Sequence, residues 1–529
     1  MHKKNSMEKI KYWNLAGILF IISSLVMGYL VYSNFNKGLV MNDEAFYLFH
    51  FKDAKNVLTV DSTNYFRIFK IFYTDNVYHF RIITFLLLNA SSFLLFYSIS
   101  KYYKLKISPL LFGFLGTSIN FLTWHGTIVI LNQYHGNTIL TNLALSMLVF
   151  FLISHKKWLL VFSGFFMGIL LFNGIPHSIT VIPIILFLLI NFWKKDKTVI
   201  FLFFTGIIAA IFFYFTFIED LSVFIKQLEY IKIYKEFHTK QHPKRFYIIW
   251  VAQIIGFVLI PVALLLFFLI RKKVQKESVD KLLLYSGIAI VLLSVFYFNL
   301  YVLYVYTGLL MYRFYMNEHI SLEKKTLCIL LTLLPFGLAF GSGFYFYIRG
   351  GMYQIYYLLA INIAVICMYN FRAYLVYLSF FFYSVVIYPL FLYDKGWKDF
   401  VYVEQTSKIQ LNGHDFYVDK ERKKDLDDLR PYLQNQPNVI YSSNHLTGYL
   451  YFLDARPPIY YYFALKDYVR FIIKKVGKTP DDFIYIESND YPFLEREIVP
   501  LKFVDHPEKY KIVKTGRFTL YLPSNYQKK

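Results

Sequence analysis

The sequence predicts an α-helical polytopic membrane protein that carries a small α/β domain at its C-terminus. Hydrophobic residues make up 57% of its 529 residues, aromatic residues make up 21%, and the mean hydropathy is +0.42. These values lie outside the range of ordinary soluble domains. Long apolar segments follow one another as far as Leu392, and a tail of ordinary charge density begins at Asp394.

The formal net charge of +22 suggests an orientation signal in a membrane rather than a nucleic-acid partner. Of the 56 Lys and Arg residues, 34 precede Tyr393, against 15 of the 34 Asp and Glu residues. The excess therefore belongs to the apolar part and is not gathered on one compact basic domain, as nucleic-acid binding would require. Only Cys328 and Cys367 are present, both in apolar stretches, so no disulfide or thiol chemistry is implied.

A transmembrane helix needs about 20 mainly apolar residues, and about thirteen segments meet this condition. They are residues 14–33, 82–100, 107–123, 138–154, 158–172, 177–193, 199–217, 247–270, 282–298, 300–316, 326–343, 353–369 and 372–392. The Lys-rich N-terminus resembles that of a signal peptide, but no suitable cleavage site follows it, so the first segment is predicted to be a span. Residues 281–316 cross either twice or once, as one long tilted helix.

Basic clusters favour two crossings over residues 281–316. The clusters at residues 3–4, 101–106, 155–157, 194–195, 271–273 and 324–325 fall on one side of the membrane only in that case. The prediction is a multi-pass protein of the cell (inner) membrane with a cytoplasmic N-terminus. The external segments would then be residues 34–81, 123–137, 218–246, 343–352 and 394–529.

Two domains are expected, a transmembrane domain over residues 1–393 and an extracytoplasmic α/β domain over residues 394–529. Within the tail, the patterns predict helices over 420–433 and 446–453 and strands over 439–442, 483–487 and 518–522. No motif in the tail points to a reaction. Acceptor recognition and lid-like support of the external loops are both hypotheses for its role.

Acidic residues on the external side are few, and Asp43 and Glu44 stand out among them. They follow the first span by about ten residues and lie between apolar residues that should hold them against the bilayer. Partial desolvation makes a carboxylate more basic and suits it to general-base catalysis. Alternatively, the pair caps a helix over residues 45–50 and complements the helix dipole. The residues alone leave both interpretations open.

Residues 43–47 read Asp-Glu-Ala-Phe-Tyr, in the first external loop of a many-span chain with an external C-terminal domain. This combination resembles the GT-C class of membrane glycosyltransferases and is similar, more narrowly, to the protein O-mannosyltransferase and aminoarabinose transferase superfamily. In that superfamily an Arg commonly opens the second helix, and Arg81 fits this position. The resemblance extends over the architecture of the chain but reaches the level of motifs only in residues 40–85.

The resemblance implies a GT-C-like fold and an inverting sugar transfer with Asp43 as the catalytic base. An acceptor hydroxyl, deprotonated by Asp43, would attack the anomeric carbon of a polyprenyl-phosphate sugar, and the lipid phosphate would depart. Glu44 would orient an acceptor or a divalent metal. The implied partners are the lipid-linked sugar donor, an acceptor that is a lipid, a glycan or a protein, and membrane lipids.

The sequence departs from the superfamily at two points. Many relatives carry a second acidic residue in the next external loop, whereas residues 124–137 have none and contain His125 and His135 instead. A His-Pro-Pro element found in several relatives is also missing. The two histidines can bind substrate or a metal, or they can pack at the membrane interface. Acceptor identity and metal use therefore do not transfer from the resemblance.

A lipid-phosphate leaving group needs positive charge beside it. Arg81 is one candidate for this role. The external segment 221–245 is basic and amphipathic and ends in Lys244 and Arg245, so it binds either anionic headgroups or the donor. The glycine-rich turn over 340–351 bears Arg349 and is either a phosphate clamp or a flexible connection.

Other classes of protein share part of this pattern. A transporter usually shows charged residues within its spans and paired repeats, and neither is evident in the sequence. A lipid-linked polysaccharide polymerase or ligase tends to place its large loop between late helices. A structural or sensor protein would not require Asp43.

Overall fold

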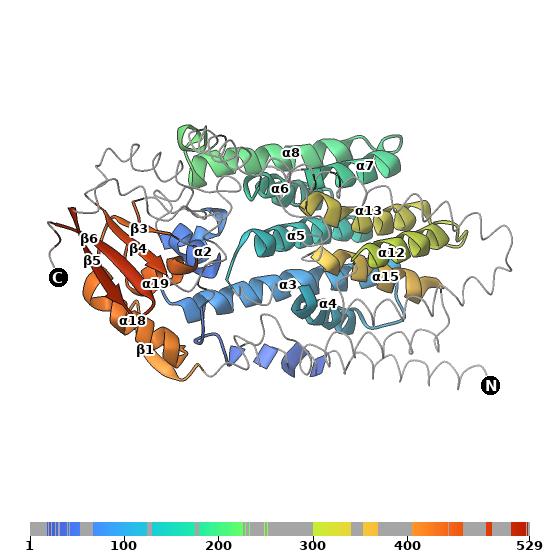
Figure 1. The fold of residues 1–529 in the computed structure, drawn as a ribbon. Coiled ribbons are helices and arrows are strands. Elements are labelled where there is room, and N and C mark those ends of the chain that lie inside the picture. Colours follow the sequence, from blue (N-terminus) through green and yellow to red (C-terminus); the bar gives the residue numbers. More distant parts are fainter. Residues whose placement is uncertain are drawn as a thin grey trace.

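The computed structural model describes residues 32–39, 43–52, 67–123, 130–174, 179–225, 300–339, 353–368, 405–442, 444–458, 483–488 and 509–524. It also describes isolated residues between 18 and 29 and at positions 41, 228, 232, 248, 251 and 526. Helices form an elongated bundle, and the C-terminal strands lie beyond one end of it (Figure 1).

The predicted spans that fall within the described ranges are helical. They correspond to α3 (Val77–Tyr103), α4 (Pro109–Thr123), α5 (Gln133–Ser154), α6 (Trp158–Phe172), α7 (Val181–Phe192), α8 (Thr198–Phe213), α12 (Leu300–Tyr315), α13 (Leu322–Ala339) and α15 (Gln354–Met368). In the described part of the chain, 3 helices are long and apolar enough to cross a membrane: Val77–Tyr103, Gln133–Ser154 and Thr198–Ile218. The predicted spans at 282–298 and 372–392 lie outside the described residues, as do half of 14–33 and most of 247–270.

The long helices differ in how far other parts of the protein cover them. The most apolar window of α5 is 78% buried, whereas that of Thr198–Ile218 is only 33% buried. Phe201, Ile208 and Phe212 on α8 are 71%, 66% and 72% exposed. A helix that is apolar on all sides and largely uncovered is suited to contact with lipid. Accordingly, α5 lies inside the bundle and α8 at its edge (Figure 1).

Two helices begin earlier than hydropathy predicts, because asparagines cap them. The side chain of Asn76 accepts hydrogen bonds from the backbone of Tyr78 and His79, so α3 begins at Val77 rather than near residue 82. Asn132 caps α5 in the same way, and α5 begins at Gln133 rather than at residue 138. Such caps satisfy amides that the helix leaves unpaired. The polar residues next to each cap belong to the first turn of a helix, not to a loop.

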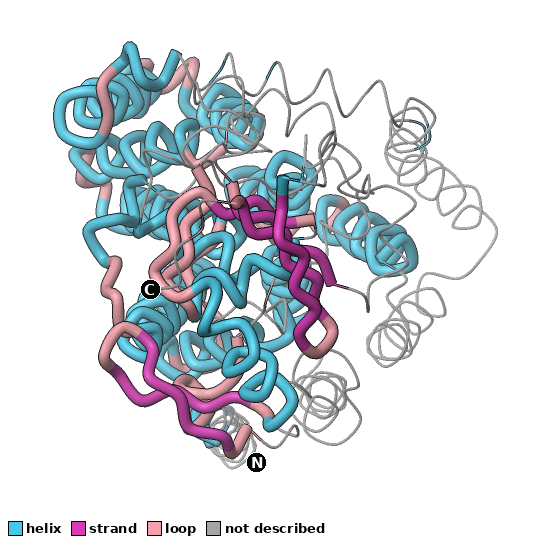
Figure 2. The backbone as a smooth tube through the Cα atoms, turned by 60° about the vertical axis from the view of Figure 1, so that its left-hand side comes forward, coloured by secondary structure: helices cyan, strands magenta, loops and turns pink. Residues whose placement is uncertain are grey.

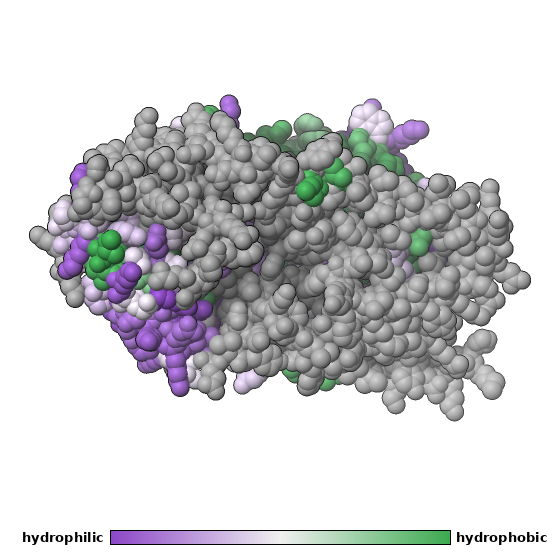
Figure 3. Space-filling model, viewed as in Figure 1, coloured by the Kyte–Doolittle hydropathy of each residue, from purple (hydrophilic) through white to green (hydrophobic). Residues whose placement is uncertain are grey.

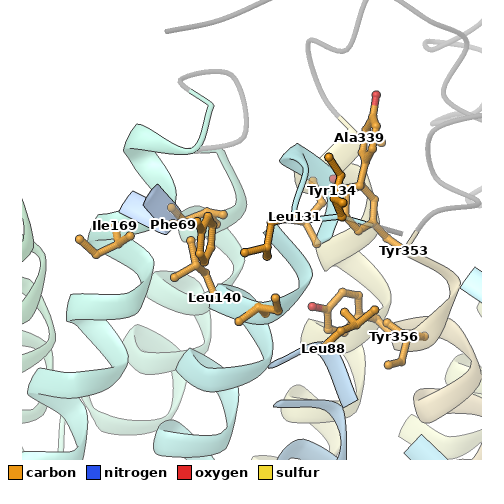
Figure 4. Packing of buried hydrophobic residues seen from close by; sticks show 14 of the residues in the cluster. Phe69, Leu88, Leu131, Tyr134, Leu140, Ile169, Ala339, Tyr353 and Tyr356 are labelled. Carbon is orange, nitrogen blue, oxygen red and sulfur yellow. The ribbon is translucent and has the colours of Figure 1, made fainter. Parts of the chain in front are cut away.

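Helices far apart in the sequence meet around α5. Figure 4 shows Leu140 of α5 among buried side chains that include Phe69, Leu88 of α3 and Tyr356 of α15. Polar contacts accompany this apolar packing, since Tyr356 donates a hydrogen bond to the Thr138 carbonyl at 3.4 Å. The bundle therefore has a continuous core at α5.

Uncharged polar side chains join α3, α4 and α5 inside the bundle. Ser92 donates to Oδ1 of Asn120 at 3.0 Å, and Nδ2 of Asn142 donates to the Ser92 hydroxyl at 2.9 Å. All three side chains are buried. In a bilayer, such bonds between helices contribute about 1 kcal/mol each. They specify how the three helices face one another.

Glycines let α6 and α8 approach until their backbones touch. A Cβ atom added at Gly164 of α6 would lie 1.9 Å from the Phe203 carbonyl oxygen of α8. A Cβ atom at Gly206 of α8 would lie 2.1 Å from the Val161 carbonyl oxygen of α6. Small residues at a helix crossing are a common means of association in membranes, where burial of apolar surface gives little driving force.

The C-terminal elements form a four-stranded sheet with helices packed beside it. The strand order is β3 (Val439–Tyr441), β4 (Ile484–Ser488), β6 (Phe518–Pro523) and β5 (Tyr510–Thr515). β3 and β4 are parallel, and the other two pairings are antiparallel. The helices are α18 (Lys420–Leu433) and α19 (Thr447–Phe452). Both predicted helices and all three predicted strands of the tail are confirmed, α18 with the predicted bounds.

A hairpin and one strand of the tail were not predicted. β1 (Ser407–Leu411) and β2 (His414–Val418) pair antiparallel around Asn412 and Gly413, both of which have positive φ. An Asn-Gly pair between alternating polar and apolar residues is the sequence signal of such a turn. β5 is missing from the prediction because its sequence, YKIVKT, does not alternate polar and apolar residues, and only its first residue, Tyr510, is buried.

Hydrophilic side chains gather at the end of the molecule where α18 and β1 lie (Figures 1 and 3). α18 carries the sequence KERKKDLDDLRPYL, and only one face of it is buried. Figure 2 shows the strands on one side of the helical bundle, not threaded through it. The polar tail and the apolar bundle are thus separate regions that meet at one end.

Substitution Gly164→Ala should weaken the packing of α6 on α8. The added methyl group meets backbone, not a flexible side chain, so the helices must separate, at a cost of about 1–3 kcal/mol. The measurement is the melting temperature of the detergent-solubilised protein by intrinsic fluorescence. Gly28→Ala is the matched control, because its Cβ would meet only a ring atom of Phe85 at 3.4 Å. An unchanged melting temperature for Gly164→Ala would contradict this packing.

Candidate functional site

The helix α2 (Asp43–Lys52) begins with the predicted catalytic residue and lies between the bundle and the C-terminal elements (Figure 1). Sequence analysis predicted a helix over residues 45–50, and the structure extends it at both ends. Ala45, Leu48 and Phe49 are almost fully buried. Asp43 is the first residue of α2. The structure describes its backbone but not its side chain.

An ion pair between Glu44 and Arg81 fixes the start of α2 to the start of α3. Nε and Nη2 of Arg81 each donate to one oxygen of Glu44 at 2.8 Å. Both side chains have no exposed surface. Two parallel bonds between a guanidinium and a carboxylate form the strongest kind of charge-assisted contact.

The remaining donors of Arg81 hold the first loop. Nη1 donates to the carbonyls of Phe35 at 2.8 Å and Lys37 at 3.0 Å, and Nη2 also donates to that of Gly38 at 2.6 Å. A guanidinium has five N–H donors, and these contacts use all of them. The predicted contact of Arg81 with a lipid phosphate would require one of these bonds to be exchanged, and it stays a prediction.

The hairpin of the tail pairs directly with this loop. The Tyr417 amide donates to the Asn36 carbonyl at 2.9 Å, and the Gly38 amide donates to the Tyr417 carbonyl at 2.9 Å. The ring of Phe416 lies 5.6 Å from the guanidinium carbon of Arg81, within the range of cation–π contact. The loop is therefore held between α3 and β2.

The far end of α2 is tied to the tail as well. Nζ of Lys52 lies 3.1 Å from Oδ1 of Asp454, and it donates to Asn412 at 3.3 Å. The rings of Phe49 and Tyr451 meet edge to face at 5.1 Å. Partners at both ends of α2 restrict its position and tilt.

Where the loop leads into α2, it also contacts α19. A Cβ atom added at Gly448 would lie 2.5 Å from Sδ and 2.8 Å from Cα of Met41. Only glycine leaves room for the backbone at Met41, which precedes Asp43 by two positions. The contact with α19 therefore restricts the path of the backbone that leads into α2.

A half-buried tyrosine, Tyr73, stacks on Phe51 of α2 and stays neutral. Tyr73 donates to Oδ1 of Asp75 at 2.9 Å, and Asn412 donates to the Asp75 carbonyl at 3.1 Å. Burial, chiefly, raises the pKa of Tyr73 far above its usual value, and Tyr451 and Asp75 raise it further. Tyr73 therefore acts as a hydrogen-bond donor at any physiological pH.

His135 lies in the first turn of α5, not in a polar loop as predicted. It is 5% exposed, and its Nδ1 lies 2.9 Å from the Ile130 carbonyl oxygen. Nδ1 also lies 3.2 Å from Nδ2 of Asn132, so it has both an acceptor and a donor beside it, and its role depends on the tautomer of the ring. The sequence placed His135 in a loop because its neighbours are polar, but those neighbours begin a capped helix. A role in substrate binding stays a prediction.

The other predicted site residues cannot be located. His125, Lys244, Arg245 and Arg349 lie outside the described residues. Within the described ranges, no group of three or more His, Cys, Asp and Glu side chains could hold a metal ion. A divalent metal beside Asp43 and Glu44 therefore stays a prediction.

Sequence reasoning selected Glu44 and Arg81 separately but not as partners, and it missed Lys52, Phe416 and Gly448. Glu44 and Arg81 are 37 positions apart, whereas Lys52 and Asp454 are 402 apart. No local pattern signals contacts at such separations. The Asn-Gly turn of the hairpin was the one available signal.

Comparison with known proteins does not assign the chain to a family. The sequence matches no protein-family model and no curated protein. The function therefore has to be argued from the site.

Replacing Arg81 by Gln should destabilise the protein severely. The substitution leaves the Glu44 carboxylate buried without its cation, which costs about 3–5 kcal/mol. Thermal unfolding in detergent measures the effect. The control is Lys52→Gln on α2, the helix that carries Glu44, which breaks a partly exposed pair and should cost about 1 kcal/mol or less. Equal losses of stability in the two variants would contradict the assignment of Arg81 as the central contact.

Proposed function

We propose that this chain is a membrane glycosyltransferase with a GT-C-like fold, which moves a sugar from a polyprenyl-phosphate donor to an acceptor on the non-cytoplasmic face. Asp43 is the base of the reaction. The observation that carries this proposal is the fully buried ion pair between Glu44 and Arg81, which fixes the turn of α2 that begins with Asp43.

A catalytic base must be held in one place, and the contacts around α2 meet this need. Glu44 directs both its oxygens to Arg81, so we assign it a positioning role within the proposed site. Asp43, its neighbour, then carries the proton transfer. This division gives the two adjacent carboxylates different roles in the same loop.

The proposed reaction is a single displacement at the anomeric carbon. The acceptor oxygen forms a bond to this carbon while the bond from carbon to the phosphate oxygen breaks. The acceptor proton moves to Asp43, and the lipid phosphate leaves with the bonding electron pair. Attack opposite the leaving group inverts the configuration. Lys244, Arg245 and Arg349 are the proposed cations for the departing phosphate.

Contacts between the loop and the tail support the proposed topology. Residues that touch across an aqueous surface must lie on the same side of the membrane, so an even number of crossings separates the first loop from the tail. Two crossings over residues 281–316 give an even number, and one crossing gives an odd number. The pairing of Asn36 and Gly38 with Tyr417 therefore favours about thirteen spans in total.

A multi-span transporter is the second candidate, because buried amides and hydroxyls join the helices of the bundle interior. A lipid-linked polysaccharide polymerase or ligase is a related alternative. The bonds between Ser92, Asn120 and Asn142 are made within the protein, which suits a rigid scaffold better than a transport path.

The proposed orientation predicts which cysteines an impermeant thiol reagent can reach. Lys511→Cys in the tail should be labelled on intact cells or spheroplasts, and Lys195→Cys, between α7 and α8, only after permeabilisation. Both positions are exposed, and the native Cys328 is buried. Labelling of Lys195→Cys before permeabilisation, with Lys511→Cys protected, would reverse the orientation.

The proposed base predicts the activity of Asp43→Asn. With the full chain reconstituted in liposomes and a polyprenyl-phosphate sugar as donor, turnover should fall by about 10²–10⁴-fold. Asp220→Asn, another acidic residue predicted to be external, should retain activity. Equal turnover by wild type and Asp43→Asn would remove Asp43 from the mechanism. Absence of turnover with every donor tested would favour the transporter or the polymerase.

A further inference from the structure

A hollow lies where the first loop, the start of α3 and the hairpin of the tail meet. Its volume is about 380 Å³, within the size range of small-molecule sites. The lining comes from three segments far apart in sequence: Tyr32 and Asn36, Asn76 and Tyr78, and His414 and Asp415.

Part of the lining serves to build the walls. Oδ1 of Asn76 accepts from the amides of Tyr78 and His79 as the cap of α3. The carboxylate of Asp415 lies 2.6 Å from Nζ of Lys408, and this cation lowers the pKa of Asp415. Asp415 is therefore ionised at neutral pH.

Other polar groups face the hollow without partners among the described residues. The side-chain amide of Asn36 and the imidazole of His414 make no hydrogen bond there. The hydroxyls of Tyr32 and Tyr78 share one bond at 2.6 Å, which leaves one hydroxyl proton to donate. The ring of Tyr32 is 49% exposed. An amide, an imidazole, a hydroxyl and an aromatic face are thus available to a ligand.

This set of groups fits an uncharged polyhydroxyl ligand. Amide and imidazole groups both donate and accept, as the hydroxyls of a sugar do. The aromatic face offers an apolar surface with a polar edge, which suits the C–H face of a sugar ring. A phosphate would require Lys or Arg in the lining, and the lining residues include the ionised Asp415 instead.

The floor of the hollow is fixed before any ligand binds. Arg81 holds the Phe35 carbonyl at 2.8 Å, and the Asn36 carbonyl accepts from Tyr417 at 2.9 Å. Asn36 therefore lies on backbone that is anchored on both sides. A preformed site loses less conformational entropy when it binds.

We infer that this hollow is a binding site for a neutral carbohydrate unit. Resting on the proposed function, that unit is the sugar part of the acceptor. A glycan in solution and the headgroup of a neutral glycolipid have the same recognition chemistry.

Binding should be measured on the full chain with Asp43→Asn in phosphatidylglycerol nanodiscs, by saturation-transfer NMR. The probes are methyl glycosides of glucose, galactose and mannose, with glucose 1-phosphate as the charged comparison. At least one neutral glycoside should bind with a Kd of about 1 mM, corresponding to about −4 kcal/mol. Saturation transfer to none of the neutral glycosides, or preference for the phosphate, would overturn the inference.

Two variants test whether the bound glycoside occupies the hollow. Asn36→Ala combined with His414→Ala removes two hydrogen-bonding groups, so the affinity should fall about 10-fold or more. His319→Ala is the matched control, an exposed histidine in the α12–α13 connection, and it should bind normally. Equal affinity of the double variant and the control would place binding elsewhere and overturn the inference.

Two further comparisons separate the related possibilities. Nanodiscs that contain a neutral galactolipid should suppress the glycoside signal if the site takes a membrane headgroup, and leave it unchanged if the site takes a soluble glycan; both results support a carbohydrate site. Because binding is measured without Asp43, glycoside binding by a chain that transfers no sugar refutes the proposed function alone. Transfer without glycoside binding refutes this inference alone.

Discussion

The buried ion pair of Arg81 with Glu44 is the contact on which the rest of the site depends. Removing each of the two charges from water costs several kcal/mol, and only an ion pair of excellent geometry offsets this cost. Arg81 achieves this by directing two donors to the carboxylate and three to loop carbonyls. One side chain therefore joins the start of α3, the start of α2 and the loop that precedes α2, and a shift of any of them would leave an unpaired buried charge.

The C-terminal strands and helices complete this arrangement from the other side. β2 adds backbone hydrogen bonds to the loop at Asn36 and Gly38, and Phe416 covers the guanidinium of Arg81. Lys52 and Gly448 extend the contact along α2. The tail is thus packed on the membrane part, and its hairpin contributes to the walls of the hollow beside the first loop. Of the two hypotheses for the tail, support of the first loop agrees with these direct contacts. For acceptor recognition, the hollow is the candidate binding site.

The helical bundle supplies a scaffold stiff enough for such a site. In lipid, apolar side chains gain little by leaving one apolar surface for another, so helices associate through close packing and polar bonds. Gly164 and Gly206 provide backbone contact, and Ser92, Asn120 and Asn142 provide hydrogen bonds. The hydrogen bonds of Ser92 fix α3, whose second turn carries Arg81, with respect to α4 and α5. The packing of α3 in the bundle therefore also determines where Arg81 holds the start of α2.

The sequence by itself determined the features that local patterns encode. Apolar runs predicted the helices within the described ranges, and charge periodicity predicted α18 with its observed bounds. The sequence also selected Asp43, Glu44 and Arg81. Only the tertiary structure decided that Glu44 and Arg81 are partners, that His135 is buried in a capped helix, and that the hairpin pairs with the first loop. For the two pairings, the physical reason is that Glu44 lies 37 positions from Arg81 and Asn36 lies 381 positions from Tyr417, where pairing depends on packing and leaves no periodic signal in the chain. The cap that places His135 in a helix is local, at Asn132, but hydropathy does not detect it.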